Sequence, residues 1–209
     1  MYSLIIVIPC YNEKNIFNLV KKLKKYPLII VDDGSIVNIK KKIIQNNKIQ
    51  IIRNKINKGY EYSLIKGLKK AVKNRYKYIL TMDADGEHLE SNIDKSYNFA
   101  EKNKIDLLIG ARSRLNRFSE EILSLLFSIK YNIKDPISGF KIYKTQELDK
   151  IINKIEFKYD FLIDITKIFI KKNLNVKNYN IKSSKKAKPS KHSNIISQLR
   201  IFYQLKYLF

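Results

Sequence analysis

Short apolar runs alternate with amphipathic stretches along most of the chain. Ser3–Pro9 is a continuous run rich in Ile and Val, which is typical of a strand buried on both faces. Glu13–Lys25 instead spaces its apolar residues three or four positions apart, as on one face of a helix. The same two patterns predict a helix over Tyr60–Lys73 and further strands at Leu28–Val31, Ile49–Ile52, Tyr78–Met82 and Asp106–Ile109.

This alternation, with about 20–25 residues per unit, predicts an α/β fold with a mostly parallel sheet flanked by helices. The pattern loosens after Arg112. There we expect a loop at Asp135–Phe140, helices at Gln146–Ile155 and Phe161–Lys172, and a last strand at Asn175–Ile181. The chain therefore reads as one domain over residues 1–181.

Residues 182–209 read as a basic linker followed by an amphipathic C-terminal helix, Ser193–Phe209. That helix is too short and too charged to span a bilayer, and it fits a helix lying at a membrane interface. A helix packed on protein is the alternative. No stretch of about 18 uncharged apolar residues occurs, so no transmembrane helix is predicted. The N-terminus also lacks the pattern of a signal peptide.

The formal net charge is +23, which favours a polyanion, an anionic membrane or a phosphate-rich substrate as partner. The lysines are spread along the chain, and the abundance of Lys, Ile and Asn is typical of an AT-rich genome. We therefore expect no nucleic-acid partner. Cys10 is the single cysteine, so no intrachain disulfide forms, which fits a cytoplasmic location.

Acidic residues follow the predicted strand over Tyr78–Met82. Asp83 and Asp85, separated by Ala84, can share a divalent cation such as Mg²⁺ or Mn²⁺. A plain turn is the alternative, but Glu87 and His88 add further groups that can bind a metal. Such a cation would neutralise charge on a diphosphate leaving group.

Two further segments carry weaker signals. Asp32-Asp33-Gly34-Ser35 can accept hydrogen bonds from a base or a ribose, or it can form a turn and a helix cap. Gly59 precedes a predicted helix, where backbone can approach a phosphate. Neither a Walker sequence nor a Gly-x-Gly-x-x-Gly is present, which disfavours P-loop ATPases and Rossmann dehydrogenases.

Several ordered segments together resemble glycosyltransferase family 2, the inverting GT-A class. The similarity is greatest to dolichol-phosphate mannosyltransferases and polyprenyl-phosphate glycosyltransferases, and it extends from Ser3 to about Ile181. It implies a GT-A (Rossmann-like) fold, a nucleotide-sugar donor and a divalent metal. The segments are Val7–Glu13, Ile30–Ser35, Asn57-x-Gly59, Met82–His88, Gly110–Arg112 and Ser138–Lys141.

The resemblance implies roles for individual residues. Asp83, Asp85 and Glu87 would hold the metal, with Glu87 standing where this branch often has Gln. The nucleotide-sugar would lie against Pro9, Tyr11, Glu13, Asp32, Asp33, Gly59, Asp83 and Ala84.

The resemblance also implies a catalytic group. Arg112 and Lys141 would face the donor phosphates, with Lys141 standing where the branch usually has Arg. Asp135 is our candidate base. A lipid-phosphate acceptor would need little base catalysis, because it is already an anion.

We therefore predict an inverting glycosyltransferase that moves a sugar from a nucleotide diphosphate to a lipid-phosphate or membrane-linked glycan acceptor. We expect it in the cytoplasm, peripheral to the membrane through the C-terminal helix, with a homo-oligomer left open. One rival is an Asp-x-Asp phosphatase with Asp83 as nucleophile, although Glu87 stands where Thr or Val is expected. Another is a sugar nucleotidyltransferase, whose Gly-rich N-terminal loop is missing. A non-enzymatic basic nucleic-acid or membrane-binding module would leave the acidic strand ends unexplained.

Overall fold

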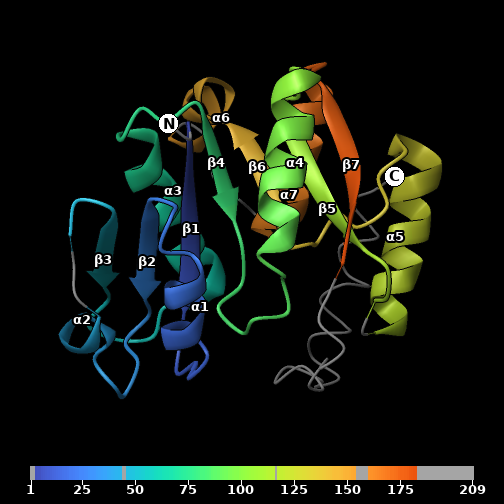
Figure 1. Cartoon of the computed structure of the whole chain (residues 1–209). Coiled ribbons are helices and arrows are strands. Elements are labelled where there is room, and N and C mark those ends of the chain that lie inside the picture. Colours follow the sequence, from blue (N-terminus) through green and yellow to red (C-terminus); the bar gives the residue numbers. More distant parts are fainter. Residues whose placement is uncertain (1–2, 44–45, 116, 154–159, 183–209) are drawn as a thin grey trace.

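The computed structural model describes residues 3–43, 46–115, 117–153 and 160–182. Within them a seven-stranded sheet has the order β3-β2-β1-β4-β6-β5-β7 (Figure 1). β6 runs antiparallel to β4 and β5, and the other pairs are parallel. This confirms the predicted α/β fold. The strands are β1 Leu4–Cys10, β2 Leu28–Asp32, β3 Ile49–Arg53, β4 Tyr78–Thr81, β5 Leu107–Arg112, β6 Lys141–Lys144 and β7 Val176–Ile181.

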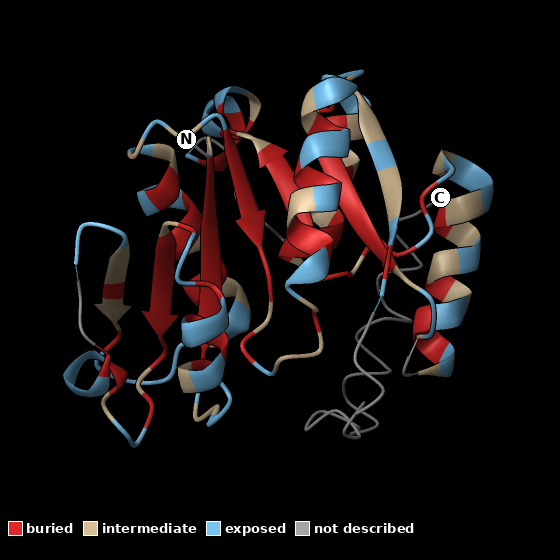
Figure 2. Ribbon diagram, viewed as in Figure 1, coloured by how far each residue is buried: buried red, intermediate tan, exposed pale blue. Residues whose placement is uncertain are grey.

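Helices cover both faces of the sheet, which explains why the central strands are continuous apolar runs. In β1, Leu4, Ile6 and Ile8 face one helical layer while Ile5 and Val7 face the other. Figure 2 shows the resulting buried centre. One layer contains α1 Ile16–Lys22, α2 Ile39–Lys42 and α4 Ser91–Lys102, and the other contains α3 Tyr60–Val72, α5 Phe118–Tyr131, α6 Thr145–Ile152 and α7 Phe161–Lys171.

The strand β6 was not predicted, and it changes what lies beside the acidic residues. Its residues Lys141–Lys144 pair with Tyr78–Thr81 of β4. The chain must therefore enter β6 at the end where β4 finishes. This brings the predicted loop, residues 135–140, to the carboxyl end of β4. The helices α2, α4 and α5 were also missed.

The predicted amphipathic helix Ser193–Phe209 and most of the linker lie outside the described residues. The domain boundary at 181 therefore stays a prediction, although β7 does end at Ile181. Within the described part of the chain, no helix is both long and apolar enough to cross a membrane.

Candidate active site

The parallel strands β1, β2, β4 and β5 all end at the same edge of the sheet, which lies at the bottom of Figure 1. Tyr11, Asp32, Asp83 and Arg112 stand at or just beyond those ends. The carboxyl edge of a parallel sheet is where α/β proteins bind ligands. These four predicted residues therefore lie at one edge of the sheet.

Asp83 is fixed by side chains from two other segments. Its Oδ1 accepts a hydrogen bond from the Tyr60 hydroxyl at 3.0 Å, and its Oδ2 lies 3.2 Å from Nε2 of His88. Burial alone would raise the pKa of Asp83. The hydrogen bond and charge of His88 and the hydrogen bond from Tyr60 outweigh burial, and the pKa of Asp83 is lowered. The side chain remains 33% exposed. Asp83 is thus an oriented, ionised carboxylate open to a ligand.

Asp85 and Glu87 gather more negative charge beside Asp83. Burial raises the pKa of both, and the charge of Asp83 on Asp85, and of Asp85 on Glu87, raises it further. The Asn15 amide donates to the Asp85 carbonyl at 2.7 Å and ties this loop to the loop after β1. Mutual repulsion between carboxylates is what a bound cation relieves, and oxygen ligands suit Mg²⁺ and Mn²⁺.

The carboxylates supply only part of a metal shell. Across residues 3–43, 46–115, 117–153 and 160–182, no three His, Cys, Asp or Glu side chains are grouped so as to hold a metal by themselves. A cation bound at Asp83 and Asp85 would take its remaining ligands from donor phosphate oxygens and water, as Mg²⁺ commonly does. The residues therefore fit a metal shared with the substrate.

Asp32 lies at the end of β2 and is held by protein partners. It is fully buried, its Oδ1 accepts the Ser35 N–H at 2.9 Å, and its other oxygen pairs with Arg53. The structure pairs this carboxylate with Arg53, and the contact of Asp32 with base or ribose stays a prediction. Arg53 is 29% exposed and also donates to the Ser35 carbonyl, so it is the polar group that the open edge presents here.

Asp33 is also buried and serves the loop before α3. Its two oxygens accept the backbone N–H groups of Lys58 at 2.9 Å and Gly59 at 2.8 Å, and Asn54 donates at 2.7 Å. Gly59 has a φ of 94° and open space around it. Its N–H donates to Asp33, so both residues hold this loop, and their roles in donor binding stay predictions.

Of the residues predicted to contact the nucleotide-sugar near the end of β1, some are buried in the core and others are exposed. Pro9 is a buried strand residue and Ala84 is 6% exposed, so neither side chain lines an open pocket. Tyr11 is 47% exposed and Glu13 is half-buried. The Asn12 side-chain carbonyl accepts the Ile36 N–H at 2.8 Å, which holds the loops after β1 and β2 together. Tyr11 and Glu13 remain accessible for the predicted nucleotide contact.

Arg112 and Asp135 form a buried ion pair. Both oxygens of Asp135 accept from the guanidinium, at 2.8 Å and 3.1 Å, and the Arg112 backbone N–H also donates to Asp135 at 3.2 Å. Glu120 lies 3.4 Å from the same guanidinium. Asp135 is only 1% exposed, and its carboxylate orients Arg112 in this structure. Its role as the base stays a prediction.

Lys141 does not face the open edge. Its side chain is fully buried in β6, and Nζ donates to the carbonyls of Pro136 at 2.6 Å and Ser138 at 2.8 Å. Burial lowers the pKa of this amine to about 7. The amine holds the loop that leads into β6, and the contact of Lys141 with donor phosphates stays a prediction.

Sequence reasoning missed Tyr60 as a site residue and gave His88 only a generic role. His88 is 3% exposed, packs its ring edge against Phe140 at 5.5 Å between centroids, and has no hydrogen-bond partner for Nδ1 among the described residues. The spacing of five residues from Asp83, with a turn at Gly86, was the available signal for His88. Nothing local could indicate Tyr60, because it reaches Asp83 from another helix.

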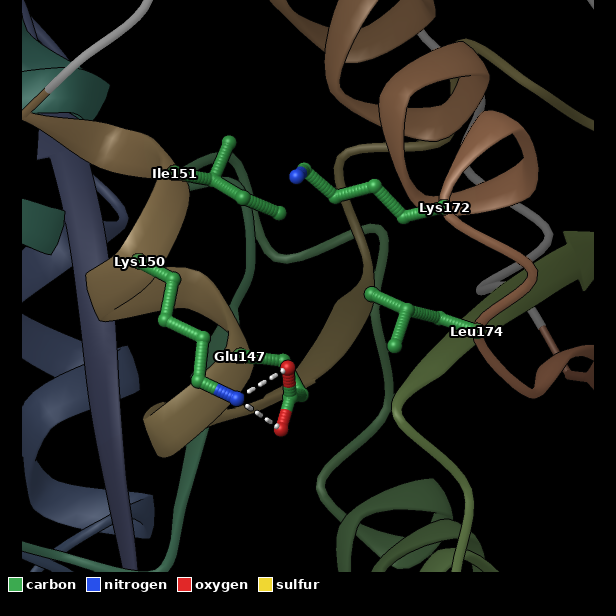
Figure 3. Close-up of a pocket in the computed structure, with 5 residues that line it drawn as sticks. All are labelled: Glu147, Lys150, Ile151, Lys172 and Leu174. Atoms are coloured by element: carbon green, nitrogen blue, oxygen red, sulfur yellow. Dashed lines mark hydrogen bonds and ion pairs between the residues drawn. The ribbon is translucent and has the colours of Figure 1, made fainter.

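A separate pocket of about 290 Å³ lies away from this edge (Figure 3). It is lined by Ile151, Leu174, Lys172 and the ion pair of Glu147 with Lys150. Its helix α6 begins beside Tyr78, where β4 starts, so the pocket belongs to the opposite edge of the sheet. It contains none of the candidate residues.

Comparison with known proteins decides between the remaining functions. Residues 5–136 match the family described as Glycosyl transferase family 2. The chain belongs to glycosyltransferase family 2. It is thus a glycosyltransferase, and the phosphatase, the nucleotidyltransferase and the non-enzymatic binding module are set aside.

Two archaeal relatives support this assignment. An uncharacterised Methanocaldococcus jannaschii protein, MJ0544, is 32% identical over 69% of this chain and 73% of its own length. The UDP-N-acetylglucosamine–dolichyl-phosphate N-acetylglucosaminyltransferase of Methanococcus voltae is 26% identical over 96% of this chain and 93% of its own length.

Solved structures show the same fold as this family 2 glycosyltransferase. Glucosyl-3-phosphoglycerate synthase of Mycobacterium tuberculosis, crystallised with phosphoglyceric acid, has a TM-score of 0.72 at 14% identity, over 98% of this chain and 79% of that one. S. aureus TarS 1-349 with UDP-GlcNAc has a TM-score of 0.66 at 16% identity. It aligns with 100% of this chain, which spans 66% of TarS 1-349.

Proposed function

We propose that this glycosyltransferase moves a sugar, with inversion, from a nucleotide-diphosphate donor to a lipid-phosphate acceptor, with Mg²⁺ or Mn²⁺ at Asp83 and Asp85. The observation that carries the proposal is the oriented, ionised and partly exposed Asp83 carboxylate, held by Tyr60 and His88 at the carboxyl edge of the sheet. The M. tuberculosis synthase has also been crystallised with Mn²⁺ and UDP-glucose, which supports a metal here.

The reaction breaks the bond between the anomeric carbon and the donor diphosphate. An acceptor oxygen attacks that carbon from the opposite side, and the electron pair of the broken bond stays on the departing diphosphate. A divalent cation at these carboxylates supplies positive charge to that leaving group. Asp135 and Glu120 fix the Arg112 guanidinium at the same edge. Its role is to donate hydrogen bonds to the departing diphosphate, and preorganised donors of this kind usually do most to lower the activation barrier.

A lipid-phosphate acceptor suits the groups present at the edge. Its phosphate oxygen is already an anion, so the attack requires no proton acceptor. Asp135, the candidate base, is engaged with Arg112 through both oxygens, which supports an acceptor of this kind. The M. voltae relative is named for a dolichyl-phosphate acceptor. We propose a place for the enzyme at the cytoplasmic face of the membrane.

Titration calorimetry with UDP-GlcNAc or GDP-mannose, with and without Mn²⁺, tests the metal. Asp83→Asn and Asp85→Asn should each weaken Mn²⁺-dependent donor binding by about tenfold or more. Asp94→Asn is the matched control, because Asp94 pairs with Lys25 on the outer surface. Equal Mn²⁺-dependent binding by all three variants would rule the metal site out. Wild-type turnover with polyprenyl phosphate then tests the acceptor, and donor binding without that turnover would refute it.

A further inference from the structure

The helix α5 exposes an apolar stripe in addition to the side that it buries. Leu123 and Phe127 pack into the core, whereas Phe118, Leu125 and Ile129 are 71%, 60% and 75% exposed. Figures 1 and 2 show α5 at the edge of the molecule with pale exposed segments along its outer side. We call Phe118, Leu125 and Ile129 the α5 stripe.

The spacing places these side chains on one face of the helix. Positions seven and four residues apart lie one above another, and the half-buried Ile122 and Leu126 lie beside them. Single exposed apolar residues are ordinary, but a contiguous apolar surface usually marks a contact with a partner or a lipid. Because α5 is apolar on its outer side as well as its buried side, we expect a partner or a lipid to contact the outer side.

Cations gather near the C-terminal end of this stripe. Lys130 lies in the last turn of α5, and Lys167 and Lys171 lie on α7. Burial lowers the pKa of Lys167, and the charge of Asp164 opposes this shift. The positive charges of Lys171 and Lys130 lower the same pKa further, so the three amines share one region. An apolar stripe with adjacent cations is the composition of an interfacial surface.

The N-terminal end of the stripe is joined to the candidate site. Phe118 begins α5, and Glu120 in the first turn lies 3.4 Å from the Arg112 guanidinium. Glu121 is exposed beside Phe118, and Glu120 and Glu121 are the acidic residues in the first turn of α5. A surface that rests on the α5 stripe would therefore lie next to the edge where the sugar is transferred.

We propose that the α5 stripe docks on an anionic lipid surface, with Lys130, Lys167 and Lys171 facing its headgroups. A second copy of the chain is a poorer occupant, because each copy carries a net charge of +23 and two copies repel one another. The inference shares with the proposed function the premise of a membrane-borne acceptor. The tests below contain neither donor nor acceptor, so they fail or succeed independently of it.

Vesicle sedimentation of the full chain gives the first test. On vesicles of equal parts phosphatidylcholine and phosphatidylglycerol, Leu125→Ser with Ile129→Ser should weaken binding by about tenfold per side chain. The matched control is Ile36→Ser with Ile56→Ser, two exposed apolar residues on loops elsewhere, which should bind like the wild type. Lys130→Gln with Lys171→Gln should weaken binding to these vesicles and not to phosphatidylcholine alone.

The chain contains no Trp, which allows a second test that does not depend on loss of binding. Leu125→Trp should shift its fluorescence to the blue on the anionic vesicles, and Ile36→Trp should not. Wild-type sedimentation by the α5 double variant would overturn the inference, since another segment such as residues 183–209 would then hold the membrane. A blue shift that rises with protein concentration in the absence of vesicles would overturn it in favour of a second copy.

Discussion

Gly139 lies so close to Asp83 that a Cβ atom added to Gly139 would stand 2.4 Å from Oδ2 of Asp83. The Gly139 carbonyl also accepts a hydrogen bond from the Thr81 hydroxyl at 2.8 Å. The loop before β6 is therefore fixed against β4 and against the first acidic residue of the site. Only a residue without a side chain fits there, and Asp83 depends on that fit for its orientation.

Gly139→Ala should displace Asp83. Overpacking of this kind typically lowers the free energy of unfolding by about 1–3 kcal/mol. Because the added methyl meets the carboxylate itself, Mn²⁺-dependent donor binding should also weaken by about tenfold. Urea unfolding measures the first effect and titration calorimetry the second.

Gly67→Ala separates the two effects. A Cβ on Gly67 would stand 2.5 Å from Cγ1 of Val7 and 3.0 Å from Cγ2 of Val31, in the core beneath α3. This variant should lose stability while its Mn²⁺-dependent donor affinity stays at the wild-type value. If the two glycine variants lost the same donor affinity, the special role of Gly139 would be refuted.

Asp135→Asn should reveal a positioning residue rather than a base. The amide keeps one acceptor for Arg112 and loses the charge, so kcat should fall by about tenfold to a hundredfold with the pH profile unchanged in shape. Loss of a general base would typically cost about 10²–10⁴-fold and remove the acidic limb of that profile. The measurement is kcat/KM against pH, with the exposed Asp149→Asn as control. A vanished acidic limb would show that Asp135 is the base.

The sequence predicts the central strands well because a strand buried on two faces is a continuous run of apolar residues. Ser3–Pro9 and Leu28–Val31 were placed within a residue or so of β1 and β2. β6 was missed because its four residues begin and end with lysine, and it pairs on both sides with β4 and β5. Its strand conformation is imposed by those neighbours rather than by its own pattern.

The candidate site was predictable only where the chemistry is local. Asp83 and Asp85 stand out from spacing alone, but Tyr60 comes from α3 and is brought to Asp83 by the fold. Asp32 and Lys141 were assigned to the ligand, whereas the structure buries both with protein partners. Whether a charged residue faces outward depends on packing between distant segments, which periodicity does not contain.

Arg53→Met should destabilise the fold by leaving the Asp32 carboxylate buried and unpaired. Removing one partner of a buried ion pair typically costs about 3–5 kcal/mol. Arg53→Lys keeps the charge but cannot reproduce both the pair with Asp32 and the bond to the Ser35 carbonyl. Its free energy of unfolding should therefore lie between those of the wild type and Arg53→Met. Lys25→Met breaks an exposed pair with Asp94 and serves as the control. Urea unfolding should rank these variants, and equal losses for Arg53→Met and Lys25→Met would contradict this account.

Lys141 should make stability depend on pH. Burial lowers its pKa from 10.5 to about 7, so between these values the unfolded chain binds a proton that the folded chain lacks. The free energy of unfolding therefore rises with pH across this window, by at most about 1.4 kcal/mol per pH unit. Below pH 7 both states are protonated and the dependence ends.

Lys141→Met removes the titrating amine and with it this slope. The free energy of unfolding of the wild type, minus that of the variant, should increase by about 2 kcal/mol between pH 7 and pH 9. The exposed Lys95→Met is the control, and its difference from the wild type should stay constant over the same range. Urea unfolding at several pH values gives both differences. A constant difference for Lys141→Met as well would mean that the folded chain keeps this amine protonated, bound to the carbonyls of Pro136 and Ser138 as an ammonium.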